Sequence, residues 1–198
     1  YVKNNLNFPE SKIKKFLNIS EIWLPQKKLS RKYEKLFLNK NINIIFVGRG
    51  SKKVKGIKYL IKAYLELKNE MEQLSLFIIG YNKEKLDEQN NLYFIKSILP
   101  SKISQIYKKS DILVLPSIET SKGNIEGWGL VVNEAYQFGL PVIITNKVGC
   151  YRDIVLDGVN GFIIKEKNYK LIKEKLKLLI NNPDLRYRMG IINKNIVE

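Results

Sequence analysis

The stretch DILVLP, residues 111–116, is an almost unbroken apolar run that ends in proline. Such a run predicts a short strand that is buried on both faces of a sheet. Similar runs recur along the chain, and segments with helical spacing of apolar residues separate them. The predicted strands are 44–48, 74–80, 92–95, 111–116, 141–145 and 161–164, and the predicted helices are 30–38, one from 57, one from 100, one from about 129, 170–180 and 184–192. This alternation predicts an α/β, Rossmann-like fold, with a parallel sheet and helices on both of its faces.

The segment EGWGLVVNE, residues 126–134, follows the strand at 111–116 and carries two carboxylates. Gly127 and Gly129 precede an apolar helix, and the free N–H groups of such a helix start attract phosphate. Glu134 would lie about one and a half turns inside this helix. Phosphates suit the amides, and ribose and sugar hydroxyls suit the acids, so the segment predicts a nucleotide-sugar site. The alternative is a buried helix with a glycine start and two surface glutamates.

Basic residues follow the first strand of the predicted sheet. Arg49 comes directly after the strand at 44–48, and Lys55 opens the next element. Ligands of open α/β sheets bind at the carboxyl ends of the strands, which is where both residues would lie. The alternative is a solvated basic loop in which Lys52 and Lys53 are equivalent to them. Trp128 has two interpretations as well, a core aromatic or a ligand-facing one.

The order of these motifs resembles a known family. The stretches FVGR (46–49), SDILVLPS (110–117), EGWGLVVNEA (126–135) and GLPVI (139–143) look like the C-terminal, donor-binding domain of group 1 (family 4) glycosyltransferases. The resemblance covers roughly residues 42–188. It implies the C-terminal half of a GT-B fold and a retaining enzyme that uses a nucleotide-sugar.

The resemblance also implies roles for individual residues. Arg49 and Lys55 match a basic pair that binds the donor diphosphate, and the backbone amides of 129–131 match those that cradle it. Glu134 matches the acid that binds the ribose hydroxyls, and Glu126 matches the acid beside the transferred sugar. The nucleobase would contact the backbone near Ile98. The expected site is therefore Glu126 as the catalytic residue, with Arg49, Lys55, Ile98, Gly127, Trp128, Gly129, Leu130, Val131 and Glu134 binding the donor.

No metal or cofactor is expected beyond the nucleotide-sugar donor. The chain has no histidine and no Asp-x-Asp pair, so the side chains that usually hold a metal–diphosphate are missing. Its single cysteine, Cys150, favours a reducing compartment and is interpreted as a small packed residue. The absence of histidine also disfavours one alternative, half of a non-hydrolysing sugar-nucleotide epimerase, which needs groups for proton transfer.

Length and charge limit the interpretation. The 198 residues allow one domain with a tail. We expect 1–41 to be a linker or the end of a preceding acceptor domain, and 42–198 to be a donor-binding domain from a longer enzyme. The net charge of +16 has three explanations: codon bias, an anionic membrane surface or, least favoured, nucleic acid. A non-catalytic basic binding module is therefore a further alternative.

A cytoplasmic location is expected, with peripheral association at the inner face of the plasma membrane as one option. No apolar run approaches 18 residues, the length that would span a bilayer. The proposed product class is a cell-surface polysaccharide or a glycolipid, made by transfer of a hexosyl group to a hydroxyl acceptor.

Overall fold

A seven-stranded sheet forms the centre of the computed structural model, which describes residues 28–38, 40–48 and 53–197. The strands are β1 (Ile42–Val47), β2 (Leu74–Ile79), β3 (Lys85–Asp87), β4 (Leu92–Ile95), β5 (Ile112–Leu115), β6 (Val142–Thr145) and β7 (Gly161–Ile164). Their order across the sheet is β3-β4-β2-β1-β5-β6-β7. The six strands predicted from apolar runs are all present, and they pair in parallel. The predicted α/β fold is confirmed.

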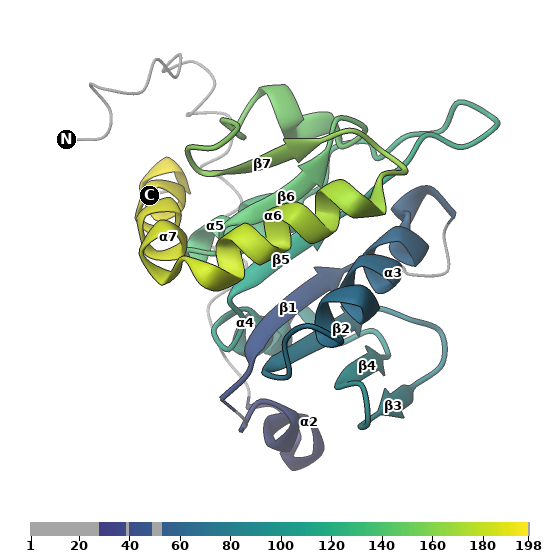
Figure 1. Cartoon of the computed structure of the whole chain (residues 1–198), viewed down its shortest axis with the longest axis vertical. Coiled ribbons are helices and arrows are strands. Elements are labelled where there is room, and N and C mark those ends of the chain that lie inside the picture. Colours follow the sequence, from purple (N-terminus) through teal and green to yellow (C-terminus); the bar gives the residue numbers. More distant parts are fainter. Residues whose placement is uncertain (1–27, 39, 49–52, 198) are drawn as a thin grey trace.

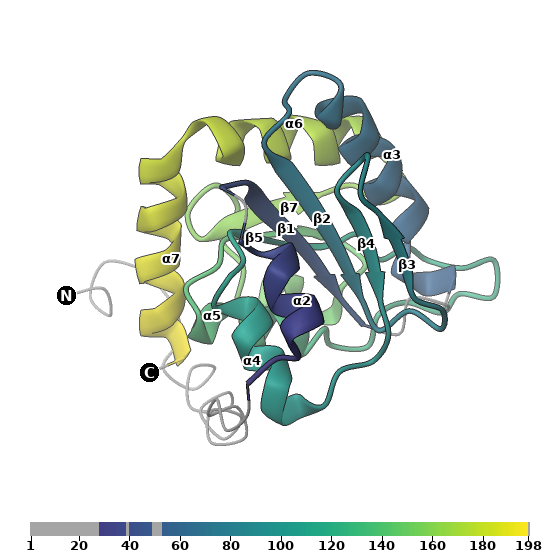
Figure 2. The ribbon, with the colours of Figure 1, turned by 90° about the horizontal axis from the view of Figure 1, so that it is seen from below.

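Helices cover both faces of the sheet. They are α2 (Arg31–Leu36), α3 (Ile57–Lys68), α4 (Pro100–Tyr107), α5 (Val131–Gln137), α6 (Tyr169–Asn181) and α7 (Pro183–Val197). Helices α3 and α6 lie side by side on one face, while α2, α4 and α5 lie on the other (Figures 1 and 2). The core lies between these layers. Every residue of β2 and β5 is buried, as their continuous apolar sequences require.

The sequence interpretation missed one strand, β3. Its sequence is Lys-Leu-Asp, and it pairs antiparallel to β4 at the edge of the sheet. A strand with two polar residues out of three gives no apolar run, so the pattern used for the other strands could not detect it. Charged residues are typical of exposed edge strands, where they discourage pairing with other chains.

Residues 28–38 pack against the sheet, although the sequence interpretation placed them in the linker or the preceding domain. Leu29 and Phe37 are buried, and the Phe37 ring stacks on Phe77 of β2 at 4.1 Å between centroids. Helix α2 is six residues long and buries no residue of its own. The flanking apolar residues therefore attach this segment to the domain, and a domain boundary at residue 42 remains a prediction.

The order of the strands fixes where a ligand would bind. The chain leaves β1 toward β2 on one side and later enters β5 on the other side, so the connections diverge between β1 and β5. Open α/β sheets bind ligands outside the carboxyl ends of the strands at such a switch point. The loop from β5 to α5 extends from this edge of the sheet, beyond the body of the domain (Figures 1 and 2).

Candidate functional site

An ion pair between two of the predicted site residues lies at the switch point. Lys55 comes from the connection after β1, and Glu126 comes from the connection after β5. The Lys55 Nζ lies 2.6 Å from Glu126 Oε2, and the two side chains are only 12% and 15% exposed. Lys55 is therefore not part of a solvated basic loop. Lys53, in the same turn, is exposed, and Arg49 and Lys52 lie outside the described residues.

Gly56 permits the turn that carries Lys55 to approach β5. Its φ is +60°, and a Cβ at this position would lie 2.0 Å from the Pro116 carbonyl oxygen. Only glycine combines this conformation with such a close approach at low cost. The N–H of Ile118 also donates to the Val54 carbonyl at 2.7 Å. The two connections at the switch point are thus joined directly through their backbones.

A short parallel pairing with the loop after β6 orients Glu126. Its N–H donates to the Lys147 carbonyl at 3.2 Å, and its carbonyl accepts from the Gly149 N–H at 3.0 Å. A Cβ on Gly149 would lie 1.9 Å from the Gly127 carbonyl oxygen, so this pairing requires glycine at 149. The Ser117 hydroxyl, at the end of β5, makes a weak 3.4 Å contact to Glu126 Oε2. The carboxylate thus faces both Lys55 and the end of β5.

The glycine-opened helix begins close to its predicted start. Helix α5 starts at Val131, and Leu130 precedes it as the capping residue. Gly129 has φ +90°, and a Cβ there would lie 2.6 Å from Val148 Cγ1, so this glycine brings the helix start against the loop after β6. Leu130 is 53% exposed and Gly127 is exposed, in contrast to the buried residues of α5 that follow.

Glu134 is buried rather than solvated. Only 8% of the residue is exposed, and the Tyr107 hydroxyl of α4 donates to its Oε2 at 2.6 Å. Burial raises the pKa of Glu134, and the hydrogen bond from Tyr107 lowers it part of the way back. Burial also raises the pKa of the Tyr107 hydroxyl well above its ordinary value, so that Tyr107 remains a donor. The alternative of two surface glutamates is wrong, because neither carboxylate is exposed.

Two further residues of the predicted site are Trp128 and Ile98. Trp128 is half-buried, packs against the core and donates its Nε1 to Asn133 Oδ1 at 3.0 Å, which agrees with the core interpretation, while a ligand-facing role stays a prediction. Ile98 is half-buried after β4. It follows β4, which β2 separates from β1 in the sheet.

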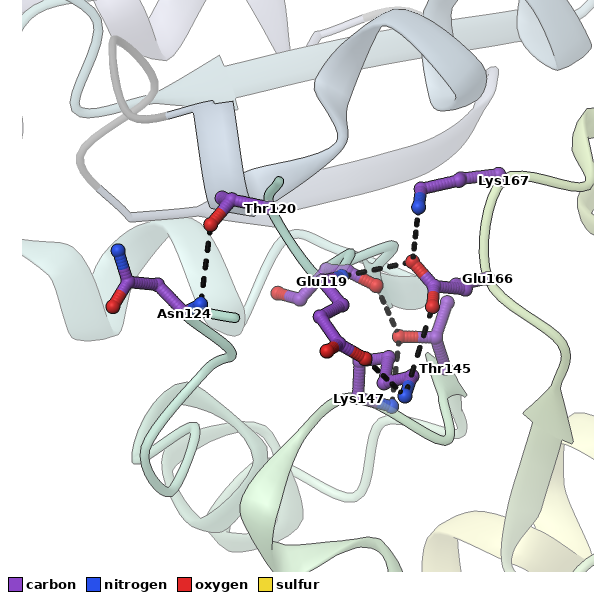
Figure 3. Close-up of polar contacts among 8 residues, drawn as sticks. Glu119, Thr120, Asn124, Thr145, Lys147, Glu166 and Lys167 are labelled. Carbon is purple, nitrogen blue, oxygen red and sulfur yellow. Dashed lines mark hydrogen bonds and ion pairs between the residues drawn. The ribbon is translucent and has the colours of Figure 1, made fainter. Parts of the chain in front are cut away.

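A second cluster of charged side chains lies at the ends of β5, β6 and β7 (Figure 3). The sequence patterns did not predict it. Lys147 Nζ lies 2.6 Å from Glu119 Oε2 and 3.7 Å from Glu166 Oε1. The N–H of Glu119 donates to Glu166 Oε2 at 2.8 Å, and Lys167 Nζ lies 3.3 Å from the same oxygen. Nothing local in the sequence distinguishes these residues from the other charged ones; only the sheet topology brings them together.

The structure also bears on metal binding, on the state of Cys150 and on membrane-spanning helices. Among the described residues, no group of acidic, histidine or cysteine side chains could hold a metal ion. Cys150 is fully buried, and burial raises the pKa of its thiol to about 12, as expected for a packed residue. Within the part of the chain that the structure describes, no helix is long and apolar enough to cross a membrane.

Comparison with known proteins identifies the family. The model of the family described as "Glycosyl transferases group 1" matches residues 27–195. The chain therefore belongs to the group 1 glycosyltransferases. It is 32% identical over 190 residues to the capsular polysaccharide biosynthesis glycosyltransferase CapM of Staphylococcus aureus, covering 92% of this chain and 48% of CapM. It is 31% identical to an uncharacterized glycosyltransferase of Haemophilus influenzae, covering 84% of this chain and 45% of that protein. The chain thus spans about half the length of these relatives.

Solved structures agree on the fold. The C-terminal domain of the group 1 glycosyltransferase LpcC from Francisella tularensis matches with a TM-score of 0.70 and 22% identity, covering 89% of this chain and 94% of that one. Anabaena HepE in complex with UDP-glucose matches with a TM-score of 0.68 and 20% identity, covering 86% of this chain and 49% of HepE. The fold is that of the C-terminal domain of GT-B glycosyltransferases, as the sequence motifs predicted.

Proposed function

We propose that this chain is the donor-binding domain of a retaining glycosyltransferase, which transfers a hexosyl group from a nucleoside diphosphate to a hydroxyl acceptor. The observation that supports this most is the Lys55–Glu126 pair at the β1/β5 switch point. It unites a cation suited to phosphate and a carboxylate suited to sugar hydroxyls in one nearly buried corner. The name of CapM, a capsular polysaccharide biosynthesis glycosyltransferase, and the UDP-glucose complex of HepE support the same substrate class.

In this proposal, Lys55 stabilises the departing diphosphate. Transfer breaks the bond between the anomeric carbon and the diphosphate oxygen and forms one to the acceptor oxygen, whose proton passes to the departing diphosphate. Negative charge develops on the diphosphate, and a fixed cation in a poorly solvated corner stabilises that charge more than water does. Arg49 would add a second cation, which can bind two oxygens at once. Because Lys55 is paired with Glu126, the diphosphate would compete with that carboxylate for the ammonium group.

The two carboxylates would contact different parts of the donor. Glu126 would accept hydrogen bonds from the transferred sugar. Glu134 lies inside the first turns of α5, and Tyr107 already bonds its Oε2, so a ribose hydroxyl would bond the other oxygen. The backbone of residues 129–131, which leads into α5, would contact the diphosphate between them, and Ile98 would lie near the base. Gly127 and Trp128 would complete the segment that contacts the donor.

We further propose that no metal ion or other cofactor assists, since lysine and arginine would provide the positive charge. An acceptor domain in the remaining half of a longer enzyme would complete the site. The product would be a cell-surface polysaccharide or a glycolipid, because CapM is named for capsular polysaccharide biosynthesis. The enzyme would work in the cytoplasm, and its net charge of +16 would favour an anionic membrane surface.

The experiment is a calorimetric titration of the 198-residue chain with UDP, GDP and ADP and with the corresponding glucose donors, in EDTA. We expect one nucleoside diphosphate to bind in the micromolar to millimolar range, a free energy of about −4 to −8 kcal/mol. Failure of every nucleotide to bind would contradict the proposal and favour a non-catalytic basic module. Binding that requires added Mg²⁺ would contradict the metal-independent part alone.

A further inference from the structure

The loop that carries Glu126 to the switch point is exposed at its tip. Between Ser117 and Glu126 the chain makes an excursion, residues 118–125, which we call the arm. At its tip the N–H groups of Gly123 and Asn124 donate to the carbonyl and hydroxyl oxygens of Thr120. Residues 121–125 are all exposed. The tip therefore cannot fix the position of Glu126, and the contacts at the base of the arm must do so.

One residue, Lys147, contacts both ends of the arm. Its side chain lies 2.6 Å from Glu119, where the arm leaves the domain. Its backbone carbonyl accepts the Glu126 N–H, where the arm returns. Figure 3 shows the Lys147 ammonium between Glu119 and Glu166, with the backbone of Glu119 also directed at Glu166. Lys147 is thus bonded on one side to the start of the arm and on the other to Glu126 itself.

Lys147 is also linked to the residues at the ends of β5 and β6. The Lys147 N–H makes a long 3.4 Å contact to the Thr145 hydroxyl, which itself donates to the Ser117 carbonyl. Ser117 in turn contacts the Glu126 carboxylate. A single exposed ion pair contributes little, but linked bonds to a shared residue restrict motion more than isolated ones. Folding also raises the pKa of Lys147, chiefly through the bond to Glu119, which agrees with a lasting pair.

We propose that Lys147 is the positioning residue for Glu126: it closes the base of the arm, so that the Glu126 carboxylate stays directed at the sugar of a bound donor. This inference rests on the proposed function. Lys147 itself does not contact the donor in this account. It acts through the loop, and its loss should affect the sugar-dependent part of binding while leaving the nucleotide-dependent part unchanged.

The test replaces the ammonium group and retains the backbone bond. Lys147→Met removes the pair with Glu119, Lys147→Arg keeps the charge, and Lys167→Met is the matched control, because Lys167 also pairs with Glu166 but not with the arm. Hydrogen exchange is measured at the Glu126 and Gly149 amides of the unliganded chain. We expect exchange about fivefold faster in Lys147→Met, and wild-type rates in the other two variants.

Calorimetry with UDP-glucose and UDP provides the second readout. We expect Lys147→Met to weaken UDP-glucose binding about fivefold with UDP binding unchanged, and Lys147→Arg to restore it. Equal weakening of both ligands together with a lower melting temperature would show a merely structural role and overturn the inference. Unchanged exchange would overturn it too. If the wild-type chain bound no nucleoside diphosphate and no glucose donor, the proposed function would fail, and the exchange rates alone would decide whether Lys147 fixes Glu126.

Discussion

The two glutamates of residues 126–134 lie in contrasting surroundings, although they belong to one short segment. Glu126 precedes α5 and faces a cation, Lys55, across the switch point. Glu134 lies inside α5 and faces a neutral phenol, Tyr107, within the core. A carboxylate paired with a cation in a poorly solvated place brings two partly buried charges together. A carboxylate beside a buried phenol receives a hydrogen bond from it, but no positive charge balances its own. The same type of side chain thus has a charged partner at one position and a neutral partner at the other.

The largest expected effect comes from breaking the charged corner. Lys55→Met leaves the Glu126 carboxylate without its cation in a poorly solvated place, so we expect a loss of about 3 kcal/mol in the free energy of unfolding. Denaturant unfolding measures it. The double variant Lys55→Met/Glu126→Gln should lose clearly less than the sum of the single variants, because the two residues share one interaction. Additive losses would show that the pair is not coupled.

The next effect tests the backbone that positions Glu126. Gly149→Ala would place a methyl group against the Gly127 carbonyl, whereas a Cβ on Gly127 would meet nothing within 4 Å. We expect Gly149→Ala to cost about 2 kcal/mol of stability and Gly127→Ala less than about 0.5 kcal/mol. Thermal unfolding of the two variants side by side measures the difference. Equal stability would contradict the close pairing of residues 126–128 with the loop after β6.

Removing the hydrogen bond between the uncharged Tyr107 side chain and Glu134 should lower the free energy of unfolding by a smaller amount. Tyr107→Phe keeps the ring, which stacks on Phe138 at 5.5 Å, and removes only the donor to Glu134. We expect a loss of about 1–2 kcal/mol, since one buried carboxylate oxygen loses its hydrogen bond. The pKa of Glu134 should rise further, because this bond lowers it in the wild type. Carboxyl NMR titration checks the pKa, and a lowered value would exclude Tyr107 as the donor.

Glu134→Gln should have the smallest effect on stability. It tests how the stability of the domain depends on pH. Folding raises the pKa of Glu134 above its ordinary value of 4.5, so the folded state binds this proton more tightly than the unfolded state does. The resulting stabilisation is complete below pH 4.5 and is lost as the pH rises through the folded value. Glutamine lacks this dependence, so the variant should gain melting temperature relative to the wild type between pH 4 and pH 8. A relative loss would contradict the raised pKa.

The same variant separates stability from function. If Glu134 binds a ribose hydroxyl, Glu134→Gln should weaken nucleoside diphosphate binding about fivefold at pH 8, where the wild-type acid is more fully ionised, because a neutral amide accepts a weaker hydrogen bond. Calorimetry measures it, with Glu174→Gln as the control, because Glu174 is an exposed residue of α6. Unchanged affinity would restrict Glu134 to a role in the core.

The sequence predicted what apolar runs and topology determine. Continuous runs such as 74–80 and 111–116 predicted the buried strands, and the rule for carboxyl ends predicted that Lys55 and Glu126 lie at one edge. The partners of these residues could not be predicted in the same way. Tyr107 reaches Glu134 across 27 positions of the chain, and Lys147 reaches Glu119 across 28. Such contacts depend on side-chain packing between elements, which no local pattern records.

The burial of Glu134 was also beyond the sequence. A glutamate in the first turns of a helix usually faces solvent and complements the helix dipole. Here α5 is buried from Val132 to Tyr136, so the acid lies in the core together with its apolar neighbours. The short edge strand β3 was missed for the opposite reason, since two of its three residues are charged and none is buried.

The central claim is that the corner formed by Lys55 binds the donor diphosphate, and two lysines of one turn test it most directly. Lys53 is exposed, whereas Lys55 is directed into the switch point. Calorimetry compares UDP with uridine for Lys55→Ala and Lys53→Ala, at low and high salt. The account predicts that Lys55→Ala weakens UDP binding at least about tenfold at both salt concentrations, leaves uridine unaffected and differs sharply from Lys53→Ala. Equal, small losses in both variants that vanish at high salt would contradict it.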